Sequence, residues 1–186
     1  MIHMASLPHS KTVTYEEWLR MPEVKREEVV NGEIRIMPAP SWKHGDVIEN
    51  LFVLMLSQVD KREVRIRLAE FDLIIRRRPL TARIPDLAVF QVNTIVEQDG
   101  RIHSAPQLVV EVLSPSNTRR ERAEKLADYA ALGVPEVWVL SPEARTVEVL
   151  YLENGQLRRQ ALLVEGILKP RHFPGVQVDI ARIWPD

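Results

Sequence analysis

Residues 107–116 constrain the fold of this chain more than any other stretch. Their apolar run, residues 108–113, contains one acidic residue, Glu111, and stops at a Ser-Pro-Ser sequence. A short apolar run that ends at a turn predicts a buried strand. An acid inside such a strand has to be neutralised, paired with a cation or bound to a metal ion. The segment therefore predicts a sheet protein with an acidic group in its interior.

A second segment, residues 83–90, has the same design. It places Asp86 near the start of another apolar run. Two buried strands that each carry one acid suggest a single site, because acids are rarely buried without a partner. We therefore expect the chain to be organised around holding Asp86 and Glu111 together.

Length and composition predict one domain without a membrane span. The chain has 186 residues, and 45% of them are hydrophobic, which suffices for a single core. We expect residues 1–13 to form a tail and residues 14–186 to form that domain. The absence of cysteine excludes disulfides, thiolate metal sites and a cysteine nucleophile. The chain shows neither a signal-peptide pattern nor an apolar run long enough for a bilayer, which predicts a cytoplasmic protein.

The order of the expected elements predicts an α/β protein of the α+β type. Asn31-Gly32 between two alternating runs predicts a β-hairpin over residues 28–36, and Ser41 is expected to cap the helix that follows. Residues 64–75 are expected to form two strands or one long bent strand, and a polar loop is expected up to Gly100. This order predicts a mixed sheet with helices on its faces and additional hairpins. The expected helices span residues 15–20, 43–59 and 119–132, and the later strands span residues 134–140, 146–152, 156–164 and 173–180.

Three acids, Glu28, Asp86 and Glu111, stand in apolar or structured surroundings and are candidate metal ligands. Converging carboxylates repel one another, so one takes up a proton unless a cation lies between them. Oxygen ligands without cysteine or paired histidines favour Mg²⁺ or Mn²⁺ over Zn²⁺, and such a metal suits the hydrolysis of phosphate esters. The residues alone leave a second interpretation open, in which Glu111 pairs with an arginine and Asp86 caps or salt-bridges at a strand end.

The expected helix after Glu111 offers a candidate catalytic cation. Glu121, Lys125 and Tyr129 recur every four residues and therefore lie on one helix face. If this face folds over the end of the Glu111 strand, Lys125 could bind the scissile phosphate or orient the attacking water. The other interpretation is a Glu-Lys pair on the protein surface, which would contribute little to stability.

The chain resembles the PD-(D/E)xK nuclease core through Pro85-Asp86 and Glu111-Val112-Leu113. Around these motifs it resembles more specifically the Uma-type restriction endonuclease family. The resemblance covers about residues 14–149, and the ordered set of motifs is more specific than the short motif alone. The matching segments are residues 28–33, 85–88, 108–116, 124–126, 129–130 and 133–138, together with His44-Gly45.

This resemblance implies a restriction-endonuclease-like core, in which helices flank a central mixed sheet, and it implies a Mg²⁺ site. Asp86 and Glu111 would bind the metal, with the Val112 carbonyl as an added ligand. Glu28 would orient a metal-bound water. The four residues expected to be catalytic are these three acids and one lysine.

The resemblance places that lysine on the helix rather than in the strand. Leu113 occupies the lysine position of the motif, so the role passes to Lys125, which would stabilise the phosphate or position the nucleophile. Glu121 stands where the family often has an aspartate and is a candidate accessory residue. Tyr129 could hydrogen-bond within the site, and His44 is expected to cap the helix or pack nearby rather than bind metal.

The leading hypothesis is a metal-dependent phosphodiester hydrolase, a DNA endonuclease that acts as a homodimer with its two sites on opposite strands. The alternative is a catalytically inactive nucleic-acid-binding or assembly module on the same fold. The missing motif lysine and the net charge of −1 favour that alternative. RNA or a small nucleotide is a third substrate class. Residues 150–186 carry no matching motif and are expected to extend the sheet or form the dimer surface.

Overall fold

The computed structural model describes residues 12–22, 26–115 and 118–185. Most of the expected tail, residues 1–13, and Ser116 of the Ser-Pro-Ser turn lie outside the described residues. Within the described chain, no helix is long and apolar enough to cross a membrane. The helices are α1 (Tyr15–Trp18), α2 (Trp42–Leu56) and α3 (Arg119–Leu132), with the 3₁₀ turns η1 (Val92–Thr94) and η2 (Ile180–Arg182).

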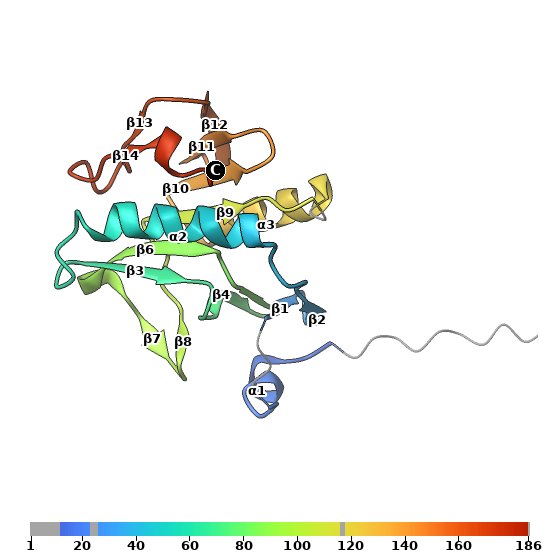
Figure 1. Ribbon diagram of the computed structural model, residues 1–186. Helices are drawn as coiled ribbons and strands as arrows, with labels where there is room; N and C mark the ends of the chain where they lie inside the picture. The colour runs from blue at the N-terminus through green and yellow to red at the C-terminus, as the bar shows by residue number, and fades with distance from the viewer. Residues whose placement is uncertain (1–11, 23–25, 116–117, 186) are drawn as a thin grey trace, which may run out of the picture.

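The strands form two six-stranded sheets and one small two-stranded sheet (Figure 1). The first sheet has the order β2 (Glu33–Ile36), β1 (Glu27–Val30), β5 (Leu80–Arg83), β4 (Leu73–Arg77), β8 (Arg101–Ile102), β7 (Glu97–Gln98). The second has the order β12 (Gln156–Leu163), β11 (Thr146–Glu153), β10 (Glu136–Ser141), β9 (Leu108–Val112), β6 (Leu87–Gln91), β3 (Val64–Leu68). Both large sheets are mixed, because β4 pairs with β8 and β9 with β10 in parallel. The α+β class is confirmed, with two mixed sheets in place of the single sheet that we expected.

The chain crosses between the two large sheets at residues 84–86. This segment connects β5 of the first sheet to β6 of the second, so Asp86 lies at the crossing and not inside a strand. Residues 69–72 cross beside it, because Leu68 pairs with Leu87 and Leu73 pairs with Arg83. Of the two alternatives for residues 64–75, two separate strands are confirmed and one long bent strand is wrong, since β3 and β4 pair within different sheets.

Local signals in the sequence account for most of the turns and helix ends. Asn31 and Gly32 have φ of 53° and 83° and form the hairpin between β1 and β2. The Ser41 hydroxyl accepts a hydrogen bond from the His44 amide, which confirms the cap of α2. Helix α3 has the expected bounds and ends at Gly133, whose φ is 89°. The expected polar loop contains the β7–β8 hairpin, which the polar sequence did not indicate.

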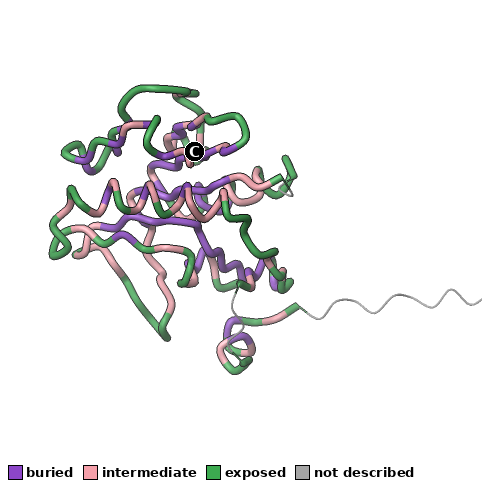
Figure 2. The backbone as a smooth tube through the Cα atoms, viewed as in Figure 1, coloured by how far each residue is buried: buried purple, intermediate pink, exposed green. Residues whose placement is uncertain are grey.

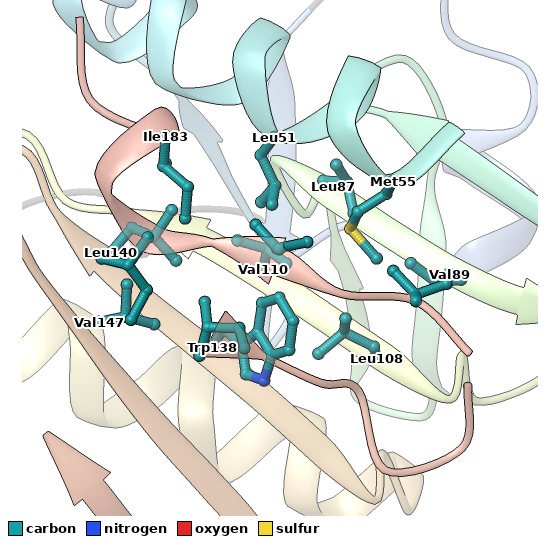
Figure 3. Close-up of a cluster of buried hydrophobic side chains, with 14 of the residues drawn as sticks. Leu51, Met55, Leu87, Val89, Leu108, Val110, Trp138, Leu140, Val147 and Ile183 are labelled. Atoms are coloured by element: carbon teal, nitrogen blue, oxygen red, sulfur yellow. The ribbon is translucent and has the colours of Figure 1, made fainter. Parts of the chain in front are cut away.

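The second sheet has an apolar core on each face. On one face, Leu51 of α2 packs with Val110 of β9 (Figure 3). On the other face, Tyr129 of α3 packs with Val109. Because successive residues of a strand point to opposite faces, Glu111 shares the face of Val109 and points toward α3.

The C-terminal segment completes the core beside α2. Val178, Ile180 and Ile183 are fully buried and belong to the same cluster as Leu51. The expected strand over residues 173–180 is wrong, because only β14 (Val178–Asp179) is a strand and it pairs with β13 (Ile167–Leu168). Strands β11 and β12 extend the second sheet as expected. Figure 2 shows burial concentrated in the central strands, while the β7–β8 hairpin is more exposed.

Candidate active site

A pocket of about 370 Å³ opens where the two sheets, α2 and α3 meet. Strand β1, the sheet crossing, the end of β9 and helix α3 each contribute one of the four residues that we expected to be catalytic. The end of β2 and the segment after it form another wall, with Ile36 and Pro38 among their residues. The pocket walls include Glu28, Asp86, Glu111 and Lys125, together with Val112, His44 and Glu121.

Glu111 projects from β9 into this pocket and contacts two side chains of α3. Lys125 Nζ donates a hydrogen bond to Glu111 Oε2 at 2.9 Å. The Tyr129 hydroxyl, one helical turn further on, donates to Glu111 Oε1. Two of the three residues expected on one face of this helix, Lys125 and Tyr129, therefore point toward Glu111.

Asp86 is attached to the strand that carries Glu111. Its Oδ2 atom accepts a hydrogen bond of 2.7 Å from the backbone amide of Val112, the residue after Glu111. Its Oδ1 atom lies 3.1 Å from Nε2 of His44 on α2. These contacts bring the two motif acids together, and they place His44 against the site. Metal ligation by the Val112 carbonyl stays a prediction.

Glu28 reaches the same site from β1 of the first sheet. Its Oε1 atom lies 3.3 Å from Lys125 Nζ and accepts a hydrogen bond of 3.2 Å from the Ile84 amide. Its Oε2 atom accepts one of 2.8 Å from Arg83. Lys125 therefore bridges acids from both large sheets.

Carboxylates crowd around Glu111 and the Lys125 ammonium and shift the pKa of both groups. The pKa of Glu111 is raised to about 7: burial is the largest cause and the charges of Asp86 and Glu28 add to it, while Lys125 and the Tyr129 hydrogen bond lower it. Burial lowers the pKa of Lys125, but its acidic neighbours outweigh burial and raise that pKa above its ordinary value. The raised pKa of Glu111 favours its neutral form, whereas the raised pKa of Lys125 favours its charged form. We attribute the difference to crowding, because a single ammonium group is shared among several carboxylates.

The donor atoms of the pocket suit a hard divalent cation. The described residues contain no group of three or more His, Asp or Glu side chains arranged to hold a metal. Asp86 and Glu111 still supply carboxylate oxygens, and the charge of Asp86 raises the pKa of Glu111, as two acids close together do without a cation between them. Mg²⁺ commonly binds through one or two carboxylates and keeps several waters. This donor set therefore fits Mg²⁺ or Mn²⁺, which keep several water ligands, better than a metal ion whose ligands all come from the protein.

Glu121 has a different position from the one we expected. Its carboxylate caps α3 and accepts hydrogen bonds from the backbone amide and hydroxyl of Thr118. These bonds lower the pKa of Glu121. The residue still lines the pocket, and its accessory role stays a prediction. The capping box was readable in the sequence as Thr118 followed three residues later by Glu121.

Two residues of this region, Arg83 and Asp128, were not predicted from the sequence. Arg83 donates to Glu28 and also to Asp128 of α3, at 2.9 Å from Nε and 2.7 Å from Nη2. Arg76 lies 3.3 Å from the other oxygen of Asp128. The available signal was a cation, Arg83, beside an acid motif, and an acid, Asp128, three residues after Lys125.

Comparisons with known proteins agree on the type of fold. The family described as "Uma2: Putative restriction endonuclease" matches residues 13–181. Among solved structures, a putative nuclease of DUF820 from Anabaena variabilis is similar, with a TM-score of 0.76 and 22% sequence identity, over 92% of this chain and 97% of that chain. At this identity the structural similarity shows the fold alone, and it confirms the nuclease-type fold. No curated protein matches the chain.

Proposed function

This chain belongs to the Uma2 family of putative restriction endonucleases, and from that membership we propose that it is a metal-dependent phosphodiester hydrolase that cleaves DNA. The site residues proposed to carry the reaction are Glu28, Asp86, Glu111 and Lys125. The proposal has two parts that can fail separately, the hydrolysis itself and the choice of DNA as the substrate.

The contact between Lys125 and Glu111 is the observation that supports the proposal most directly. Leu113 occupies the lysine position of the motif, yet an ammonium group from the next helix reaches the strand acid at 2.9 Å. The side chains of Lys125 and Glu111 are only 19% and 12% exposed. Lys125 therefore pairs with the strand acid inside the pocket, which argues against the interpretation that it forms an exposed Glu-Lys pair on the protein surface.

Asp86, Glu111 and the Val112 carbonyl are the groups that would bind Mg²⁺ or Mn²⁺. When bound, the ion would neutralise the carboxylates and polarise the scissile phosphate. The Val112 amide orients the Asp86 carboxylate through its 2.7 Å hydrogen bond. The Tyr129 hydroxyl orients the carboxylate of Glu111 in the same way.

Lys125 and Glu28 would act on the substrate and on the attacking water. A lysine ammonium has three donors, so contacts with Glu111 and Glu28 leave one for a phosphoryl oxygen. A carboxylate has about four acceptor positions. Glu28 uses two for hydrogen bonds from Arg83 and the Ile84 amide, and the Lys125 ammonium, 3.3 Å from Oε1, faces a third. The fourth is the position from which Glu28 would orient water for attack on phosphorus.

Cations at the pocket support a polyanionic substrate. Arg35 and Arg122 line the pocket. Each has an acidic partner within the chain, Glu124 at 2.8 Å and Glu148 at 2.7 Å, and could exchange it for a phosphate of DNA. A two-fold dimer would direct two such pockets at opposite strands, and it remains part of the proposal.

The test compares the wild-type chain with Asp86→Asn and Lys125→Met on linear and supercoiled DNA, with Mg²⁺, Mn²⁺ or a chelator. We expect metal-dependent cleavage by the wild type and a loss on the order of 10²-fold or more in each variant. Lys43→Ala is the matched control. Its ammonium pairs with Glu143 at 3.1 Å, and the two side chains are 43% and 65% exposed, so activity should be retained.

Equal cleavage by the wild type and both variants would point to a contaminating nuclease and refute the assigned site. DNA binding without metal or cleavage, with a steep salt dependence, would instead support the inactive binding module. Cleavage of RNA but not of DNA would keep the hydrolysis and change the substrate.

A further inference from the structure

A buried ionic cluster at the pocket includes two residues, Arg83 and Asp128, that the proposed reaction does not use. It consists of Arg83, Asp128 and Glu28, which are 2%, 7% and 4% exposed. Replacing a buried ion pair by well-packed apolar residues is often neutral or stabilising. Stability alone therefore gives little reason to place three charged side chains here, and the directions of their hydrogen bonds become the informative feature.

Arg83 connects the two acids through different edges of one guanidinium group. Its Nη1 atom donates to Glu28 Oε2 at 2.8 Å. Its Nε and Nη2 atoms both donate to Asp128 Oδ2, at 2.9 and 2.7 Å. Arginine presents its donors in a rigid plane, so a fixed Asp128 fixes the orientation in which Arg83 meets Glu28.

These contacts close into a ring that begins and ends on α3. Asp128 binds Arg83, Arg83 binds Glu28, and Glu28 lies 3.3 Å from the Lys125 ammonium. Lys125 and Asp128 are three residues apart on the same helix, so their side chains leave one helix face. The ring therefore ties the ammonium to its own helix through an acid and a cation of the first sheet.

We propose that Asp128 and Arg83 are positioning residues that orient Glu28 and thereby hold the Lys125 ammonium beside Glu111. Neither residue contacts the substrate in this role. A lysine side chain has four rotatable bonds and high rotamer entropy. Leu113 occupies the motif's lysine position, so the ammonium group comes from the helix. Lys125 therefore needs a partner with a fixed orientation, and Glu28 provides it. The catalytic consequence rests on the proposed function, whereas the orientation of Lys125 does not.

The orientation can be measured by ¹⁵N NMR of the lysine ammonium groups, since the chain has only six lysines. Lys125→Met assigns the Lys125 signal. In metal-free wild type we expect that signal to be protected from exchange with water. In Asp128→Asn, exchange should become faster by about tenfold or more, because one anchor of the ring loses its charge. Arg83→Lys should have the same effect, since an ammonium group cannot present three planar donors, and Asp128→Glu should largely restore protection.

Glu136→Gln is the matched control. Glu136 is 1% exposed and accepts hydrogen bonds from Trp138 and from the Arg171 amide. Its substitution also perturbs a buried acid but leaves the ring intact, so the Lys125 signal should not change. An unchanged Lys125 signal in folded Asp128→Asn or Arg83→Lys would overturn the proposal. So would the same loss of protection in Glu136→Gln, because the effect would then follow general destabilisation.

Kinetics give a second and separate test. For Asp128→Asn we expect kcat to fall by roughly 10- to 100-fold with little change in KM, as a misplaced catalytic group predicts. Asp128→Glu should recover most of the rate. A raised KM with unchanged kcat would contradict a positioning role and assign Asp128 to substrate binding. If the wild type cleaves no DNA, the proposed function fails, while the exchange measurement still decides whether the ring orients Lys125.

Discussion

Two buried acids in this molecule, Glu111 and Glu136, have opposite surroundings. Glu136 is the more buried, at 1% exposure against 9% for Glu111. It accepts hydrogen bonds of 2.7 Å from the Trp138 indole and from the Arg171 amide. Burial raises the pKa of Glu136, and the Arg171 and Trp138 groups lower it in part. Both of its hydrogen bonds come from uncharged N–H groups, and such bonds are the ordinary way to satisfy a buried polar group.

Glu111 is surrounded by further acids and by a cation that they share. The charges of Asp86 and Glu28 raise its pKa in addition to burial, whereas Lys125 lowers it. Burial of a carboxylate therefore does not by itself identify a site. What distinguishes the pocket is that Glu28 of β1 and Glu111 of β9 contact one ammonium group, and the charge of Asp86 at the sheet crossing acts on the same group. Substitutions around Glu111 and around Glu136 should therefore differ in their effects, with matched controls in the other region or at the surface.

The largest effect is expected for Arg83→Met. The substitution leaves Glu28 and Asp128 buried without their shared guanidinium, so the free energy of unfolding should fall by about 3–5 kcal/mol. Urea denaturation of the metal-free protein measures this change. If Arg83→Met is no more destabilising than Glu136→Gln, the two regions do not differ in the way we describe.

A smaller effect concerns pH. The pKa of Glu111 is raised from 4.5 to about 7, so the folded state binds this proton more tightly than the unfolded state does. Its stabilising contribution is complete below pH 4.5 and is lost as pH rises through about 7. In chelator, we expect Glu111→Gln to flatten this fall in unfolding free energy, measured by urea denaturation across pH. Glu143→Gln, at the surface, should keep the wild-type curve, and parallel curves for Glu111→Gln would contradict the prediction.

The smallest effect is expected for Glu136→Gln. The amide retains one oxygen acceptor, so one of the two N–H donors loses its partner and the free energy of unfolding falls by about 1–2 kcal/mol. Metal-dependent cleavage by the folded variant should equal that of the wild type. A loss of cleavage in the folded protein would mean that the two buried acids are coupled and that our comparison is drawn too sharply.

The sequence was informative where short-range rules decide the structure. Asn31-Gly32, Ser41 and Gly133 specify a turn, a cap and a helix end through their own backbone preferences. The spacing of Lys125 and Tyr129 correctly placed both on the face that meets Glu111. The roles of these residues in catalysis stay predictions, because geometry alone does not test them.

The features that were missed depend on contacts between distant parts of the chain. Arg83 and Asp128 are 45 residues apart and belong to a strand and a helix, and neither residue has a local pattern that indicates the other. The division into two sheets has the same cause. The two strands expected within residues 64–75 are present as β3 and β4, but pairing partners, not local propensity, decide which sheet each one joins.

The burial of Ile180 and Ile183 beside α2 affects the order in which this protein can fold during synthesis. Leu51 belongs to the same apolar cluster, and Asn50 of α2 donates a hydrogen bond of 3.2 Å to the Ile183 carbonyl. These partners are separated by 133 residues of chain. Helix α2 therefore leaves the ribosome long before Ile180 and Ile183, and the part of its apolar face that these residues cover stays open to other molecules until they have been synthesised.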